Sequence, residues 1–247
     1  NLTGNLTNAS AVHATTGATQ RGTILVYGAV ADALRLTVGG IADNRGGWLQ
    51  SAAATQTLTA RQWLNAGGTL LHSGTGALTL NIADLNNAQG IVQGKGSLTY
   101  RGTTLANDAG LLTFAKNLDI AASTGNSLAI TNLAKDGKAG VIETNGTLTM
   151  AASSFDGSGG QLTVAGAGNS ALSIGQTLSL SGSTLATNAK DLALSAGTLL
   201  FTGGTLAHTG DGTLRINAAN LTSSATIQSL GNVSITGTTL DHSGGYL

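Results

Sequence analysis

Residues 78–120 read LTLNIADLNNAQGIVQGKGSLTYRGTTLANDAGLLTFAKNLDI, and this stretch contains a twenty-residue repeat. Leu78, Leu98 and Leu118 each open a short phrase that has a second apolar or aromatic residue two places on. Leu85 and Leu105 follow seven residues after the first two openings, and each leads into a run containing Asn and Gly. Apolar residues two apart are typical of strands, and Asn and Gly are typical of turns. The repeat unit is therefore predicted to be a coil of short β-strands.

A coil of this size cannot bury its apolar side alone, so it must stack on its neighbours, as the coils of a parallel β-solenoid do. Leucines at equivalent places in successive coils would then form interior columns. Each rung of such a stack rises by one strand spacing, about 4.8 Å. We expect about eleven or twelve coils and a rod about 55 Å long.

The composition fits this all-β prediction. The chain has 37 glycines and no proline among 247 residues. Glycine and asparagine suit sharp corners because they tolerate the left-handed backbone conformation, and internal strands need every N–H that proline would remove. A helical fold is disfavoured by the abundant Gly, Thr, Ser and Asn. A β-sandwich is the main rival, but sandwiches do not repeat in sequence phrase by phrase.

Along the chain, residues 1–33 are predicted to be irregular first coils and residues 34–247 regular ones, continuous in one elongated domain. The predicted openings beyond the quoted stretch are Leu34, Leu58, Leu128, Leu148, Leu178, Leu199, Leu214 and Val233. The period slips at residues 118–127, where ten extra residues intervene, and at 162–177, where we expect an inserted hairpin or an irregular coil. Because regular coils are scaffold, specific contacts are expected at these slips.

Charge and composition also exclude several classes of function. The formal net charge is zero, so the chain lacks the basic surface that nucleic acids or anionic membranes require. No apolar run approaches the twenty residues of a membrane span. Without cysteine there are no disulfides or thiolate metal ligands. The first residues do not form a signal peptide, and both ends of the sequence cut a phrase in mid-course, so a fragment of a longer chain is expected.

The phrase L-x-L … L-x-N-x-G-G resembles the filamentous haemagglutinin repeats of bacterial exoproteins exported by two-partner secretion. This resemblance implies a right-handed parallel β-helix, secreted by or displayed on a Gram-negative cell after export through an outer-membrane transporter. It implies a monomeric rod in the shaft of an adhesin or of a contact-dependent growth inhibition toxin. It does not choose between those two. The phrases that carry it are Leu58-Thr59 with Leu64-Asn65-Ala66-Gly67-Gly68, Leu98-Thr99 with Leu105-Ala106-Asn107-Asp108-Ala109-Gly110, and Leu178-Ser179-Leu180 with Leu185-Ala186-Thr187-Asn188.

Trp48 and Trp63 are the two tryptophans of the chain and the weak candidates for partner contact. Trp63 precedes Leu64, a predicted inward residue, so strand alternation predicts that Trp63 points outward. An exposed indole can stack on a sugar or anchor a protein receptor. Packing of either ring against the next coil or a capping loop stays open as the alternative.

No catalytic, metal or cofactor site is predicted, and the chain is not expected to be an enzyme. A polysaccharide-cleaving β-helix would need paired carboxylates, whereas the acidic residues here fall at different places in their coils. His208 and His242 each lie two residues after a core leucine and are expected at solvated corners. Tyr100 and Phe155 are expected in the core, and the charged run at residues 135–138 at an exposed corner.

Overall fold

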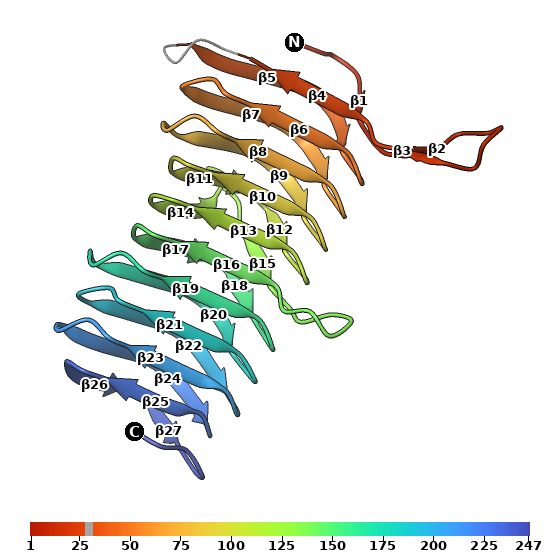
Figure 1. Cartoon of the computed structure of the whole chain (residues 1–247). Coiled ribbons are helices and arrows are strands. Elements are labelled where there is room, and N and C mark those ends of the chain that lie inside the picture. Colours follow the sequence, from red (N-terminus) through yellow and green to blue (C-terminus); the bar gives the residue numbers. More distant parts are fainter. Residues whose placement is uncertain (28–31) are drawn as a thin grey trace.

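The computed structural model describes residues 1–27 and 32–247. Within these residues there is no helix, and parallel strands wind into a β-solenoid of about ten turns with roughly 22 residues per turn (Figure 1). The predicted all-β solenoid is thus confirmed, with fewer and longer coils than expected. At about 4.8 Å per rung, ten stacked strands span about 45 Å.

One face of the solenoid is a parallel sheet of ten strands, one from each turn. In spatial order its strands are β4 (Thr23–Val26), β6 (Trp48–Ser51), β8 (Thr69–His72), β10 (Ile91–Gly94), β13 (Leu111–Phe114), β16 (Val141–Thr144), β19 (Gln161–Val164), β21 (Thr184–Thr187), β23 (Thr205–His208) and β25 (Thr226–Ser229).

A sheet of 15 strands forms the rest of each turn and bends at a corner, so that a turn contributes either one long strand or two short ones. The strands are β1 (Leu6–Thr7), β5 (Ala33–Asp43), β7 (Thr55–Leu64), β9 (Leu78–Asn86), β11 (Leu98–Gly102), β12 (Thr104–Ala106), β14 (Leu118–Ala122), β15 (Ala129–Thr131), β17 (Leu148–Ala152), β18 (Ser154–Asp156), β20 (Ser170–Ser179), β22 (Leu192–Phe201), β24 (Thr213–Ser223), β26 (Asn232–Thr236) and β27 (Thr239–Asp241). A small antiparallel hairpin, β2 (Ala11–Val12) with β3 (Thr19–Gln20), projects sideways from the first turn (Figure 1).

The core consists of columns of inward side chains that run the length of the rod, and most of the buried side chains are apolar. Removing a leucine side chain from water contributes about 1.5–3 kcal/mol, so stacking on two neighbours is what stabilises each coil. One column, which we call the long column, runs Leu6, Ala42, Trp63, Leu85, Leu105, Ile130, Phe155, Leu178, Leu199, Leu221, Leu240. The predicted core residues Tyr100 and Phe155 are both fully buried.

The strand register corrects several predicted coil openings. Leu58 stands beside Leu80, not Leu78, because Gln56 occupies the opening place of its coil. Ser170 likewise opens the coil between Leu148 and Leu192. Two openings were therefore hidden because a polar residue replaces the leucine.

The same correction applies on both sides of the second predicted slip. Leu178 and Leu199 belong to the long column and open no coil. Residues 162–177 contain no inserted hairpin, because β19 and β20 pair with the turns on either side. The pairing of β20 with β22 does shift register between Ile174 and Thr177, so this coil is locally irregular. Most of the apparent slip comes from a change of reference leucine.

The extra residues after Leu118 are real but form two loops within one turn. Residues 123–127 loop out between β14 and β15, and residues 133–139 form a second excursion closed by a bridge between Lys135 and Lys138. Leu128 does not open a coil, because Ile130 two residues later stands beside Leu105 in the long column. The charged run at 135–138 is exposed, as predicted.

A ladder of buried asparagine amides runs along one corner of the solenoid, and we call it the asparagine ladder. The Nδ2 of each of the first five members donates to the Oδ1 of the next asparagine at 2.6–2.7 Å. Every member also donates to a backbone carbonyl of the following turn. All members are at most 7% exposed. Because these side-chain hydrogen bonds form only when successive asparagines stand on adjacent rungs, the ladder fixes the register of six turns. Its members are Asn8, Asn44, Asn65, Asn87, Asn107 and Asn132.

The backbone at the corner beside the ladder shows why glycines occur there. It also shows that the prediction of a left-handed conformation for asparagine is wrong. No asparagine among the described residues adopts a positive φ; the left-handed residue lies two places later, as at Gly67 (φ 62°) and Gln89 (φ 55°). The next residue is glycine because a Cβ on Gly68 would lie 2.0 Å from the Asn44 carbonyl oxygen of the preceding turn. Asparagine is needed for its amide and glycine for the close approach of two turns.

The ladder ends where the core changes. Gly157 takes the place that follows Asn132, and a Cβ there would lie 2.9 Å from the Phe155 ring. The next two turns place Leu180 and Phe201 at this corner, both at most 1% exposed. The C-terminal turns therefore hold the same corner by apolar packing.

We predict that Asn87→Ala lowers the free energy of unfolding by about 2–4 kcal/mol, because it removes the Asn87 Oδ1 acceptor from Asn65 Nδ2 and leaves the buried Asn107 Oδ1 without its donor. Chemical denaturation measures this change. Asn81→Ala, at an exposed position of β9, is the matched control and should have little effect. Equal effects of the two substitutions would show that the ladder does not stabilise the fold.

Candidate functional site

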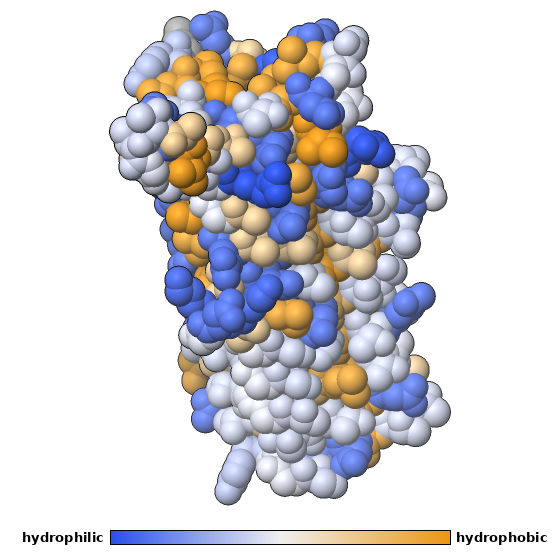
Figure 2. All heavy atoms as spheres, turned by 90° about the vertical axis from the view of Figure 1, so that its right-hand side faces the viewer, coloured by the Kyte–Doolittle hydropathy of each residue, from blue (hydrophilic) through white to orange (hydrophobic). Residues whose placement is uncertain are grey.

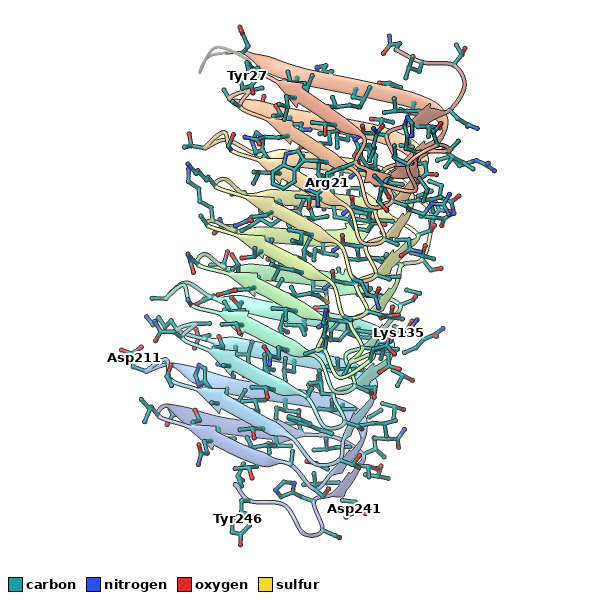
Figure 3. The ribbon with its side chains drawn as sticks, turned by 45° about the vertical axis from the view of Figure 1, so that its right-hand side comes forward. Arg21, Tyr27, Lys135, Asp211, Asp241 and Tyr246 are labelled. Carbon is teal, nitrogen blue, oxygen red and sulfur yellow. The ribbon has the colours of Figure 1, made fainter. Side chains whose placement is uncertain are left out.

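The Trp48 side chain is the best-defined feature on the outer surface. Trp48 begins β6 and lies partly buried on the outward face of the ten-stranded sheet. The Arg21 guanidinium carbon lies 5.4 Å from the ring centroid, and the indole Nε1 donates to Gln50 Oε1 at 3.2 Å. Figure 3 places Arg21 close to the N-terminal end of the rod. The cation and the amide hold the ring in one orientation, which a platform for a flat partner requires.

Below Trp48, the outward column of the same sheet is largely aliphatic. It continues through Thr69, Ile91, Leu111 and Val141, one residue per strand, and all of these are partly buried. Four rung spacings make this strip about 19 Å long. We call Trp48 and these four residues the Trp48 strip. Such a strip can pack against apolar groups or sugar rings, and it holds no nucleophile or paired carboxylate.

Trp63 is not part of this surface, and its predicted outward orientation is wrong. The side chain is 1% exposed and stands in the long column between Ala42 and Leu85. Arg61 and Gln62 both face away from the core at the bend of β7, so alternation changes phase there and turns Trp63 inward. The small Ala42 leaves room for the ring. Trp63 is core, and Trp48 alone remains a predicted partner contact.

A shallow groove lies below the loop at residues 123–127, near the first predicted slip. Its volume is about 510 Å³, and its lining consists of small and hydroxyl-bearing side chains with a few apolar ones. The residues are Ala122, Asn126, Ser127, Leu128, Ala151, Ala152, Ser153, Ser173, Ile174, Gly175 and Ser195. The groove carries no charged side chain, so it offers shape but no group for acid, base or ion chemistry.

Charged groups on the described surface are few and dispersed. Arg45 pairs with Asp43 at 2.7 Å, and Arg101 pairs with Asp119 at 2.5 Å. The hydrogen bond from the Arg45 side chain lowers the pKa of Asp43. Nowhere in residues 1–27 and 32–247 do three His, Asp or Glu side chains gather as metal ligands would. In Figure 2 the C-terminal part of the visible face is mostly neither strongly hydrophilic nor hydrophobic.

Two histidines are buried in equivalent places at the ends of β8 and β23, which the sequence did not reveal. His208 was expected at a solvated corner but is 1% exposed, with Nδ1 2.8 Å from Ser229 Oγ and Nε2 2.9 Å from the Ala189 carbonyl oxygen. His72 is also fully buried, and neither ring nitrogen has a well-formed hydrogen bond. Both precede the pattern Ser or Thr, Gly, any residue, Gly, which could have flagged them as one repeated turn.

No protein-family model, curated protein or solved structure matches this chain. Within the described residues, no helix has the length and apolar character needed to cross a membrane. The fold therefore rests on the structure itself, and the family resemblance stays a prediction from the repeated phrases.

The two tryptophans should respond differently to substitution. Trp63→Ala should lower the free energy of unfolding by about 3–5 kcal/mol, because it opens a large cavity in the core. Trp48→Ala should cost less than about 1 kcal/mol, since it removes only a partly exposed contact. Urea denaturation of both variants measures the difference. A larger loss for Trp48→Ala would contradict the assignment of inside and outside.

His72 should make stability depend on pH. Burial lowers the pKa of His72 below its ordinary 6.5, and the backbone of Gly76 offsets part of this shift. The unfolded chain therefore binds more protons than the folded chain as pH falls below about 6.5, and stability decreases from there down to the folded pKa. His72→Leu should flatten the plot of unfolding free energy against pH in this window. An unchanged slope would contradict the prediction, since the other three histidines are the same in both proteins.

Proposed function

We propose that this chain is a rod-like shaft segment of a large secreted or surface-tethered bacterial exoprotein, which projects an adhesive or toxic element toward a target cell. The long column carries this proposal: it continues from Leu6 to Leu240 without a break. Because every coil contributes one residue to this column, each coil adds one rung of length and acts as a spacer. The haemagglutinin-type phrases in the sequence support the bacterial exoprotein assignment and export through an outer-membrane transporter.

The proposed mechanism is length combined with stiffness. Strands of successive turns pair in parallel, so their backbone hydrogen bonds lie along the rod and join every turn to the next. Interior columns and the asparagine ladder resist sliding between turns, because a slip of one residue would place polar groups in the core. The chain reaches this stiffness without any disulfide. The role needs no catalysis and no cofactor.

A second candidate function is binding of a receptor or glycan by the Trp48 strip. The observation that favours it is the fixed orientation of the Trp48 ring between Arg21 and Gln50. Trp48→Ala should then weaken binding of the purified protein to target cells, whereas Lys138→Ala, at an exposed position of the excursion at residues 133–139, should not. Unchanged binding after Trp48→Ala would reject this candidate.

A shaft made of spacers should tolerate the loss of a whole coil. Deleting residues 88–107 joins Asn87 to Asp108 and removes one turn from the ladder, so the protein should keep its β-sheet circular dichroism spectrum and its cooperative melting. Deleting residues 88–97 removes half a turn and should abolish cooperative melting, because every later column is out of register. If both deletions are tolerated, or if neither is, the coils are not independent spacers.

Export is tested separately. In the cells that carry the gene, the protein should be cleaved by protease added to intact cells or should accumulate in the medium. Protection from protease until the cells are lysed, with none in the medium, would contradict the exoprotein assignment.

A further inference from the structure

The Trp48 strip lies on the side of the rod, so it faces solvent whatever adjoins the two ends of the rod. Its five residues stand on consecutive turns, and each is partly buried. The strip has a definite beginning and end, because the same column has Thr23 in the turn before Trp48 and Gln161 in the turn after Val141. A partner must therefore fit a finite line of largely apolar side chains whose middle member is Ile91.

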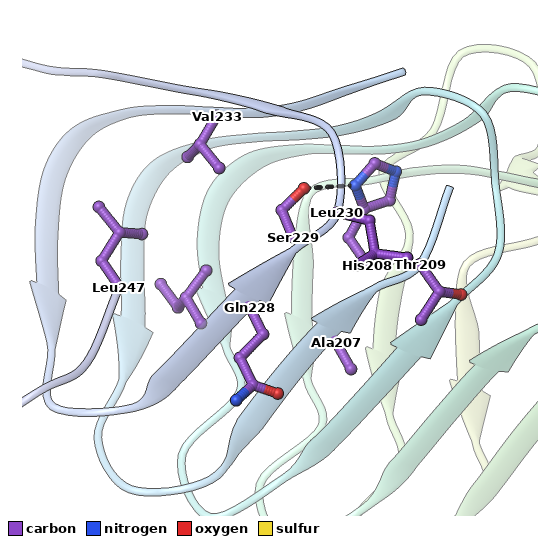
Figure 4. Close-up of a pocket in the computed structure, with 9 residues that line it drawn as sticks. Ala207, His208, Thr209, Gln228, Ser229, Leu230, Val233 and Leu247 are labelled. Atoms are coloured by element: carbon purple, nitrogen blue, oxygen red, sulfur yellow. Dashed lines mark hydrogen bonds between the residues drawn. The ribbon is translucent and has the colours of Figure 1, made fainter. Parts of the chain in front are cut away.

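The C-terminal turns of the same sheet differ from the strip. Their outward residues are small or uncharged and polar, as at Thr205 and Thr226 in the column that carries the strip. In Figure 4 the outward side chains of Ala207 and Gln228 point away from the buried His208. The apolar line is thus a local feature of five turns and not a general property of the sheet.

The two ends of the strip carry charges of opposite sign. Arg21 lies over the Trp48 ring, and Glu143 stands two residues after Val141 on the same strand. Neither charge belongs to an ion pair within the part of the chain that the structure describes. Gln50 adds a directed donor at the Trp48 end, because its Oε1 accepts from the indole and its Nε2 is left to donate elsewhere. A partner that fits both ends carries the same charges in the reverse order.

We propose that two copies of this chain pair side by side through their Trp48 strips, with the two rods antiparallel. A second copy is the partner of choice because the strip is complementary to itself when it is reversed. A twofold axis along the strand direction at Ile91 sets this residue against its own copy. The same axis sets the large Trp48 ring against the smaller Val141, and Thr69 against Leu111. Because the interface is isologous, it closes as a dimer and does not propagate.

The neighbouring outward column of the same sheet completes the match. Its members on the five turns of the strip are Gln50, Leu71, Gln93, Thr113 and Glu143. The axis sets Glu143 of each copy opposite Gln50 of the other, where the Gln50 amide and the neighbouring Arg21 guanidinium can donate to the carboxylate. Gln93 meets its own copy, and two side-chain amides can pair there. Polar groups in this column therefore face polar groups at both ends and at the centre.

The size of the contact predicts how tightly the copies bind. Seven turns of each copy face each other, because the turn of Thr23 meets the turn of Gln161. With about 4.8 Å per turn and about 13 Å for the two columns, the contact covers about 900 Å² over both copies. Interfaces of this size are typical of weak, reversible association. We expect monomers in dilute solution and dimers at high concentration.

This arrangement differs from the monomeric rod that the family resemblance implies. It also gives the Trp48 strip an occupant that excludes a receptor or glycan at the same place, so it competes with the second candidate function. It does not depend on the proposed role as a shaft, because the experiments below use only the purified chain.

Charge reversal tests the pairing. Arg21→Glu and Glu143→Arg each set like charges against one another at both ends of the strip, so each alone should raise the dimer dissociation constant at least about tenfold. An equal mixture of the two variants should recover the affinity of the unaltered protein, since every carboxylate then faces a guanidinium. Sedimentation equilibrium over a concentration series measures association, and circular dichroism establishes that each variant is folded.

A matched pair of substitutions tests the position of the axis. Ile91→Arg sets two guanidinium groups against each other at the centre of the contact and should abolish association. Thr205→Arg adds the same side chain in the same column outside the contact, at an equally buried place, and should leave association unchanged. An unaltered protein that stays monomeric up to about 1 mM, a mixture that binds no tighter than the single variants, or equal effects of Ile91→Arg and Thr205→Arg would each overturn the proposal.

Single spin labels test the polarity independently. The chain has no native cysteine, so one label per chain at Ala186→Cys or Ala207→Cys reports only distances between copies. Antiparallel pairing at Ile91 predicts Cα-level separations of about 40 Å for position 186 and about 49 Å for position 207, because each further turn adds two rung spacings. Equal separations at the two positions would show that the rods run in the same direction, and would overturn the proposed axis.

Discussion

In-register stacking of parallel strands is the interaction on which the whole structure depends. A single turn of roughly 22 residues has no core of its own, so its apolar side chains are buried only by the turns on either side. Each inward place must therefore be filled compatibly in every turn. This constraint accounts for the small Ala42 beside Trp63 in the long column, and for Gly157 beside the Phe155 ring at the next corner. Large side chains in one turn are matched by small ones nearby.

The asparagine ladder shows how a polar residue can serve the same constraint. A buried amide costs free energy unless its donors and acceptors are paired. Here each amide pairs with the identical amide of the next turn, so the ladder is stable only if the turns are in register. Where the ladder ends, Leu180 and Phe201 replace it by apolar contact. The N-terminal turns thus use hydrogen-bond geometry, and the C-terminal turns use shape, to hold the same corner.

The fold class was predictable because the leucine phrases at 78, 98 and 118 fall on consecutive rungs. The residue that opens each coil was less predictable, since Gln56 and Ser170 take places that leucine occupies in other coils. The direction of Trp63 was also missed, because two successive residues, Arg61 and Gln62, face outward and so turn Trp63 inward. Burial of His72 and His208 was not predicted, because the residue at that place differs from turn to turn; only the Ser/Thr-Gly-x-Gly pattern that follows both could have marked the two places as equivalent. Of the Trp48 strip, only Trp48 was predicted from the sequence. Its other members could be identified only from the strand register, because they lie on strands that are 20 or more residues apart in the chain.

The central claim, that each turn adds one rung to a continuous rod, is tested most directly by distances along one outward column. Gln93, Ala186, Ala207 and Gln228 lie on this column, four, five and six rungs apart from Gln93. Spin labels on paired cysteine substitutions, read by pulsed electron resonance, should give Cα-level separations of about 19, 24 and 29 Å, a constant step of about 4.8 Å per turn. Separations that do not increase by a constant step from one turn to the next would contradict the solenoid and the shaft built on it.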